Sequence, residues 1–134
     1  MRFNRLDRLG RPISVLGATA ALGAVLMLGA QPAAADGSVR NPGGEAGVDF
    51  ASYGEIFTVH DYKANGVATV GQIDIKSGGN WLAYDDVINT KGYDGPPVKV
   101  NYSIGEGTQV RYRACQYSGS AGAYDCSGWH YDKA

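Results

Sequence analysis

Apolar and polar residues alternate along two segments in the last third of the chain, residues 98–104 and 110–114. A period of two is typical of a β-strand with one buried face, so each segment predicts a strand. Residues 105–107 are Gly-Glu-Gly and predict the turn between the two strands. The apolar set is Val98, Val100, Tyr102 and Ile104 in the first segment and Val110, Tyr112 and Ala114 in the second.

Three further strands are indicated upstream. Residues 56–62 form a β-branched and aromatic run, and residues 67–75 form a second one after Asn65-Gly66. Because Asn-Gly is a strong hairpin signal, we expect these two strands to be antiparallel neighbours. Residues 81–88 predict a third strand, whereas the glycines and prolines of 91–97 predict a loop.

The fold class follows from this spacing. Short strands separated by turn signals are typical of a small sandwich or open barrel, so residues 55–134 predict an all-β antiparallel domain of five to six strands. The last of these strands is expected within residues 127–132, pairing back on the strand before it. Residues 36–54 are rich in glycine and predict a flexible leader, with 45–53 the only stretch expected to make a helical turn.

The first 35 residues have a different composition. Four arginines precede an apolar run at residues 12–30 that contains no charge, and Ala33-Ala34-Ala35 follows it closely. A basic start, an apolar middle and a small-residue exit predict a secretory signal peptide cleaved before Asp36. A retained membrane anchor is the alternative, but glycines dilute the run. We therefore expect an extracellular protein that carries no membrane segment after cleavage and is released from the cell.

The charge balance limits the partners. Four of the 12 basic residues and one of the 13 acidic residues precede Asp36, so residues 36–134 carry a net charge of −4. General binding to a phosphate backbone depends on lysine and arginine, and no nucleic-acid partner is expected. This part of the chain has room for one domain.

The only two cysteines, Cys115 and Cys126, predict a disulfide. In an exported chain an even cysteine count indicates oxidation, and two cysteines allow one pairing. A zinc site would need more ligands than these two cysteines provide.

Candidate catalytic residues are few. A scheme like that of small guanyl-specific microbial ribonucleases, which are also secreted and acidic, would use Glu55 as the base, Arg111 or Arg113 for the phosphate, and His130 as the acid. Those enzymes pack a helix on their sheet and close most of the chain with a disulfide, and neither feature is predicted here. His60 and Asp61 are adjacent on a predicted strand, so they point to opposite faces and do not make a dyad.

Metal and cofactor binding have little support. Asp85, Asp86 and Asp94 are the best candidates for a calcium site, but their spacing does not match the EF-hand loop. Solvated loop carboxylates are far commoner, so no metal and no cofactor are expected.

The aromatic content is high, with nine tyrosines and two tryptophans. A small sandwich cannot bury all of them, and exposed aromatic side chains often anchor a partner. The disulfide-closed loop would lose little entropy on binding, which favours it as a contact element. The candidate binding residues are Tyr117, Tyr124, Trp129 and Tyr131.

The C-terminal part also carries a recognisable motif. Tyr112-Arg113-Ala114-Cys115, ten further residues, and then Cys126-Ser127-Gly128-Trp129 resemble a group of small secreted actinomycete proteins without an assigned activity. The resemblance covers most of residues 55–134. It implies export, a disulfide and a β fold, and it carries over no catalytic residue.

Two functions remain open from the sequence. The first is a non-catalytic extracellular module that binds a protein or a glycan at the cell exterior through exposed aromatic side chains. The alternative is a small secreted hydrolase of the microbial-ribonuclease type. The sequence favours the binding module, because the acid, base and cation of an enzyme are only scattered candidates.

Overall fold

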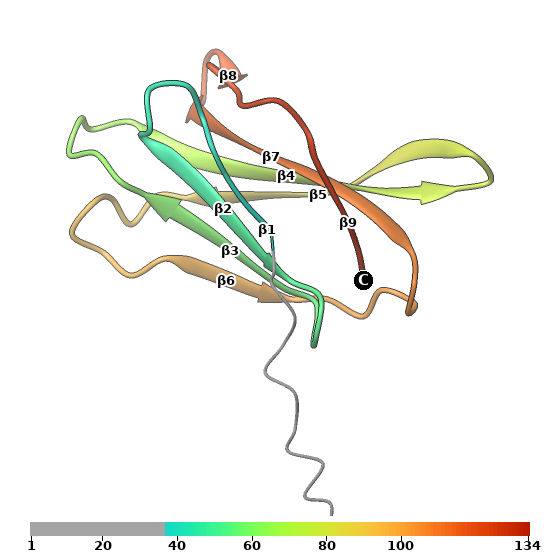
Figure 1. Ribbon diagram of the computed structural model, residues 1–134. Helices are drawn as coiled ribbons and strands as arrows, with labels where there is room; N and C mark the ends of the chain where they lie inside the picture. The colour runs from blue at the N-terminus through green and yellow to red at the C-terminus, as the bar shows by residue number, and fades with distance from the viewer. Residues whose placement is uncertain (1–36) are drawn as a thin grey trace, which may run out of the picture.

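The protein is a sandwich of two antiparallel β-sheets (Figure 1). The computed structural model describes residues 37–134, so the predicted signal peptide lies outside the described residues. One sheet contains, in order, β1 (Gly37–Arg40), β2 (Ala46–Ala51), β3 (Ile56–Asp61) and β6 (Val98–Asn101). The other contains β5 (Asn80–Asn89), β4 (Ala68–Ser77) and β7 (Gln109–Ser118), and the far edge of β7 pairs with both β8 (Gly122–Tyr124) and β9 (His130–Lys133). The all-β prediction is confirmed, and the described residues include no helix.

The core fills the space between the sheets. Phe50 and Phe57 extend from the four-stranded sheet, and Tyr112 meets them from β7 with ring centroids 5.6 and 6.1 Å away. The alternation predicted for β7 is confirmed, because Val110, Tyr112 and Ala114 are all fully buried. In the segment that begins with β6, Ile104 is buried and joins the same core.

The predicted hairpin at Asn65-Gly66 is wrong. β3 pairs with β2 on one side and β6 on the other, so it has no free edge for β4. Gly66 has the positive φ of 70° that the turn signal requires, and the Asn65 Oδ1 accepts a hydrogen bond from the backbone N–H of Val67. The local turn therefore forms, but it carries the chain from one sheet to the other.

The prediction of a flexible leader at residues 36–54 is also wrong, as is the helical turn at 45–53. β1 and β2 form one edge of the four-stranded sheet, and Ala46, Val48 and Phe50 are fully buried. Glycines within and around these strands masked the short apolar alternation. Residues 37–134 contain nine strands because β1, β2 and β8 add to the six predicted.

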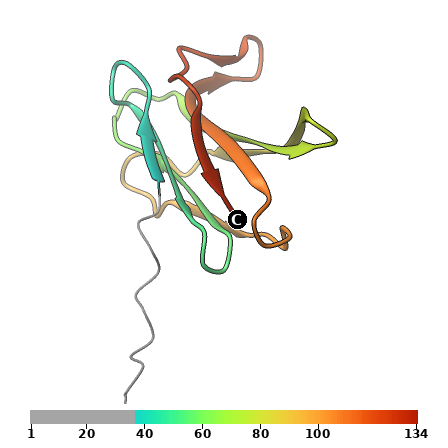
Figure 2. The same cartoon turned by 45° about the vertical axis from the view of Figure 1, so that its right-hand side comes forward.

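The hairpin of β4 and β5 extends beyond the body of the sandwich (Figures 1 and 2). A bulge between Ile73 and Asp74 shifts its register. β5 is an edge strand, since only β4 pairs with it. Leu82, Tyr84 and Ile88 of this strand are exposed.

The predicted disulfide between Cys115 and Cys126 is present. It ties β7 to the segment that follows β8, and Ser127 next to it donates and accepts hydrogen bonds with the backbone of Ala114. The end of the chain is therefore held against β7 before β9 begins. Within residues 37–134 no helix could cross a membrane.

Candidate ligand-binding face

Aromatic and basic side chains gather on the outer face of the five-stranded sheet. Because the even-numbered residues of β7 face the core, Arg111 and Arg113 point outward. β5, β9 and the segment before β9 each add one aromatic side chain. We call this set the aromatic-basic face, and it consists of Trp81, Arg111, Arg113, Trp129 and Tyr131.

Arg111 lies at the centre of this face. Its guanidinium carbon is 4.9 Å from the ring centroid of Trp81 and 4.3 Å from that of Trp129. The guanidinium donates to Asp74 through Nε at 2.8 Å and Nη2 at 2.7 Å. Both side chains of this ion pair are largely buried, so Arg111 is fixed in place and its charge is balanced.

Arg113 is held differently. Its Nε donates to the Oε1 of Gln72 at 2.8 Å, and its guanidinium lies 4.6 Å from the ring centroid of Trp129. Gln72 in turn donates to Asp86 at 3.3 Å, so an amide separates Arg113 from that carboxylate. Within residues 37–134 no carboxylate is paired with Arg113 directly. The side chain is oriented without being neutralised.

Tyr131 lines an open groove and pairs with Arg111 across β9 and β7. It is 60% exposed, and its ring meets Trp81 edge-on with centroids 5.7 Å apart. The groove has a volume of about 400 Å³ and is lined by Trp81, Gln109, Val110, Tyr131, Asp132 and Lys133. It combines aromatic rings with amide, carboxylate and ammonium groups, which is a typical composition for a small-molecule or saccharide site.

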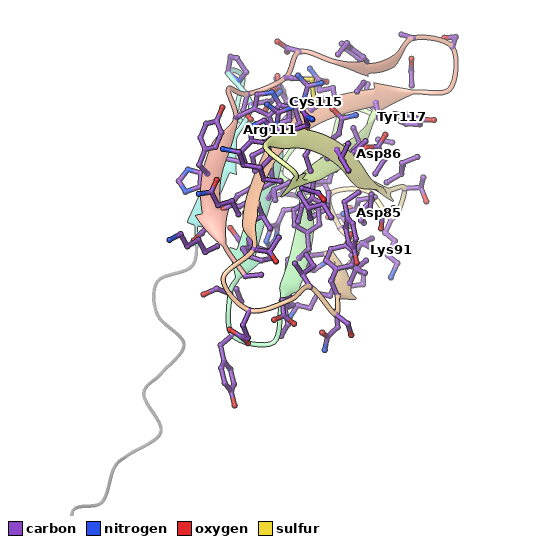
Figure 3. All side chains as sticks on the ribbon, turned by 90° about the vertical axis from the view of Figure 1, so that its right-hand side faces the viewer. Asp85, Asp86, Lys91, Arg111, Cys115 and Tyr117 are labelled. Atoms are coloured by element: carbon purple, nitrogen blue, oxygen red, sulfur yellow. A yellow bond between two sulfur atoms is a disulfide. The ribbon has the colours of Figure 1, made fainter. Side chains whose placement is uncertain are left out.

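The four predicted binding residues do not form one surface. Trp129 and Tyr131 belong to the aromatic-basic face. Tyr117 pairs with Ala123, whereas Tyr124 pairs with Gln116, and residues 116 and 117 point to opposite faces of the sheet. Figure 3 shows Tyr117 well away from Arg111. The disulfide-closed loop therefore does not present Tyr117 and Tyr124 to the same ligand.

The residues of the ribonuclease-like scheme are not brought together. His130 pairs with Tyr112 and shares its inner face, with ring centroids 5.2 Å apart. Arg111 and Arg113 lie on the outer face of the same sheet. Glu55 is in the turn between β2 and β3 of the other sheet, at a positive φ of 44°. The candidate acid and the candidate cations are thus separated by the sheet itself.

A second hollow, of about 450 Å³, lies beside His60. The Nε2 of His60 is 2.6 Å from the Oδ2 of Asp49, and the imidazole stacks on Tyr62. Asp61, Tyr93 and Asp94 complete most of the lining. The histidine is half-buried, and no serine, threonine or cysteine lines this hollow.

The carboxylates considered for calcium have other partners or lie apart. Asp85 accepts a hydrogen bond from the Tyr102 hydroxyl at 2.8 Å, while Asp86 accepts one from Gln72. Asp94 lies in the hollow with His60. Burial, followed by the bond to Asp85, raises the pKa of Tyr102. Over residues 37–134 no three His, Cys, Asp or Glu side chains come close enough to hold a metal ion.

Trp81 was not predicted as part of the site. It comes directly after the turn at residues 78–79 and pairs with Lys76 on the outer face of the hairpin. The sequence contains only two tryptophans, and the position of Trp81 near a turn could have marked it as a candidate binding residue. Both of them lie on the aromatic-basic face.

No protein family, no curated protein and no solved structure matches this chain.

Proposed function

We propose that this protein is an exported, non-catalytic binding domain that contacts its ligand through the aromatic-basic face. The observation that carries the proposal is that Trp81 meets Trp129 and Tyr131, which lie far along the chain, on one face around Arg111. Trp81 and Tyr131 also line an open groove there. Aromatic side chains supply large contact areas at little entropic cost, and they are enriched among the residues that dominate binding energy.

The site is also preorganised. Hydrogen bonds to Asp74 and Gln72 orient the two arginines, and the arginines support the ring of Trp129. The disulfide holds Cys126, three residues before Trp129. A ligand would therefore meet a surface that is already ordered, which lowers the entropic cost of binding.

Export is part of the proposal. The basic, apolar and small-residue segments at the N-terminus support a secretory signal, and a disulfide is compatible with an oxidising environment. The resemblance of the C-terminal motif to small secreted actinomycete proteins favours the same location.

The test uses the two tryptophans as reporters. The chain from Asp36 onward contains both sheets and the disulfide. The purified chain is titrated with neutral and acidic polysaccharides and with secreted proteins, and tryptophan emission is recorded. We expect at least one ligand to shift the emission, and we expect Tyr131→Ala to weaken its binding about tenfold or more.

Tyr53→Ala is the matched control, because Tyr53 is 81% exposed but lies in the turn after β2 of the other sheet. Its affinity should equal that of the wild type. Equal affinity of the Tyr131→Ala variant, or the absence of any ligand across the panel, would contradict the proposed function.

A further inference from the structure

The aromatic-basic face differs in charge from the rest of the molecule. Residues 37–134 contain eight basic side chains, and four of them lie on this outer face or at its ends: Lys76, Arg111, Arg113 and Lys133. Asp74 and Asp86 are the carboxylates that share the face, and Asp132, which accepts a hydrogen bond from the Tyr112 hydroxyl, also lines the groove. The face therefore has a surplus of positive charge on a protein whose net charge is negative.

This surplus is available to a ligand at one position in particular. Asp74 neutralises Arg111, whereas Arg113 uses Nε for Gln72 and its ring-facing side for Trp129. Among residues 37–134 no carboxylate forms an ion pair with the two terminal nitrogens of Arg113, and the side chain is partly exposed. A guanidinium fixed in this way offers parallel N–H donors to an anionic group.

The groove includes Trp81, on which Arg111 packs, and it suits a sugar ring. Trp81 and Tyr131 provide apolar ring surface, and Gln109 and Lys133 provide polar groups that can bond hydroxyls. Lys133 pairs with Gln109 across β9 and β7, so its ammonium group lies on the same side as Arg111 and Arg113.

We propose, as an extension of the proposed function, that the ligand of this face is an acidic polysaccharide, with its sugar rings on Trp81 and Tyr131 and its anionic group on Arg113. The anionic group can be a carboxylate or a sulfate, since both present oxygens to a guanidinium. A single-stranded nucleic acid is disfavoured because its dense phosphate charge needs a row of free cations. This face supplies one oriented, unneutralised guanidinium on a net negative protein.

The experiment compares charged polymers with neutral polymers of the same backbone. The probes are polygalacturonate against its methyl ester, dextran sulfate against dextran, and a single-stranded DNA oligomer, each read by tryptophan emission. We expect the protein to bind at least one charged polysaccharide and to bind its neutral counterpart at least tenfold more weakly. The affinity for the charged polymer should fall as the salt concentration rises. Polygalacturonate and its methyl ester test for recognition of a carboxylate, and dextran sulfate and dextran test for recognition of a sulfate.

Arg113→Gln tests the position of the anion. We expect it to weaken binding of the charged polysaccharide about tenfold or more, and we expect Arg113→Lys to retain part of the affinity. Arg40→Gln is the matched control, since Arg40 also stacks on an aromatic ring, 3.8 Å from the centroid of Tyr62, but lies in the other sheet. Lys133→Gln is a second variant for the same face, with a smaller expected loss of about twofold to threefold.

Three results would overturn the inference. They are equal binding of the charged and neutral polymers, unchanged affinity in Arg113→Gln, and tighter binding of the DNA oligomer than of either acidic polysaccharide. The protein could instead bind a neutral polysaccharide and lose that binding in Tyr131→Ala but not in Arg113→Gln. This result would support the proposed function and contradict the inference that the ligand is anionic. No binding of any polymer or protein would contradict both.

Discussion

Gly71 shows how closely single residues are packed between the sheets. A Cβ atom at this position would lie 2.7 Å from side-chain carbons of Phe57 and Val59, and 2.8 Å from Val48. These carbons belong to buried side chains of the opposite sheet. Glycine is therefore required here to let the two layers approach.

We expect Gly71→Ala to lower the free energy of unfolding by about 1–3 kcal/mol, because the added methyl group overpacks the core. Urea denaturation measures the change. Gly119→Ala is the control, since Gly119 has no atom within 4 Å of the added position. Equal stability of the two variants would show that the sheets can separate without cost.

Glu45 makes the stability of the protein depend on pH. Its own backbone N–H and the Asn41 side chain, 2.8 Å away, donate hydrogen bonds to the carboxylate, and Lys63 lies 3.7 Å from it. These bonds lower the pKa of Glu45 below its ordinary value of 4.5. The contribution of Glu45 is therefore complete above this ordinary value and is lost as the pH falls through the lowered pKa.

We expect Glu45→Gln to be less stable than the wild type at pH 7, with the difference shrinking as the pH falls below 4.5. Denaturation midpoints measured from pH 7 down to pH 3 give this difference directly. Glu106→Gln, at an exposed turn position, serves as the control. A gap between Glu45→Gln and wild type that does not change with pH would contradict the linkage.

At the scale of the elements, the disulfide orders the C-terminal strands. Cys115 and Cys126 close a short loop around β8, and cross-linking a loop of this length stabilises the folded state by about 3 kcal/mol. We expect reduction, or the double change Cys115→Ala and Cys126→Ala, to lower the free energy of unfolding by that amount.

Urea denaturation with and without reductant measures the loss, and tryptophan emission reports on Trp129. The double variant should not respond to reductant, which separates the disulfide from other effects of the reagent. If the reduced wild type unfolded at the same urea concentration as the oxidised form, the loop would contribute nothing to stability.

The elements that could be predicted from the sequence are those with long apolar alternation. β7 is one of them, because three alternating apolar residues mark its buried face without any knowledge of its neighbours. β2 was missed because its burial depends on β3 and β7, which cover it from two directions. The hairpin signal at Asn65-Gly66 described the local turn correctly. It could not tell which strand edges were free, since β2 and β6 already occupy both sides of β3.

At the scale of the whole molecule, the aromatic-basic face depends on the register in which β4, β5, β7 and β9 pair. Trp129 and Tyr131 could be predicted as binding residues from the sequence. Trp81 lies beside Tyr131 and Arg111 only because the β4–β5 hairpin places it there. The same register separates Tyr117 from Tyr124. Pairing partners far apart in the chain decide both outcomes, and no local pattern encodes them.

We expect the folded protein not to cleave RNA. His130 lies on the inner face of the sheet and Arg111 on the outer face, so an acid and a phosphate-binding cation cannot reach one substrate bond. Incubation of the purified chain with total RNA, beside His130→Ala, provides the measurement. Cleavage by the wild type that disappears in His130→Ala would reverse this conclusion and make the protein a secreted ribonuclease.

The exposed edge of β5 has a consequence for how copies of this protein meet. A strand of ten residues with one unpaired edge and with exposed Leu82, Tyr84 and Ile88 is a template for association between molecules. Antiparallel pairing of two such strands about their centre would set Asp85 opposite Tyr84 and Asp86 opposite Ala83 of the other copy, which gathers four carboxylates near the middle of the contact. The repulsion between these carboxylates, together with the bulge in the hairpin, disfavours edge-to-edge association of two copies.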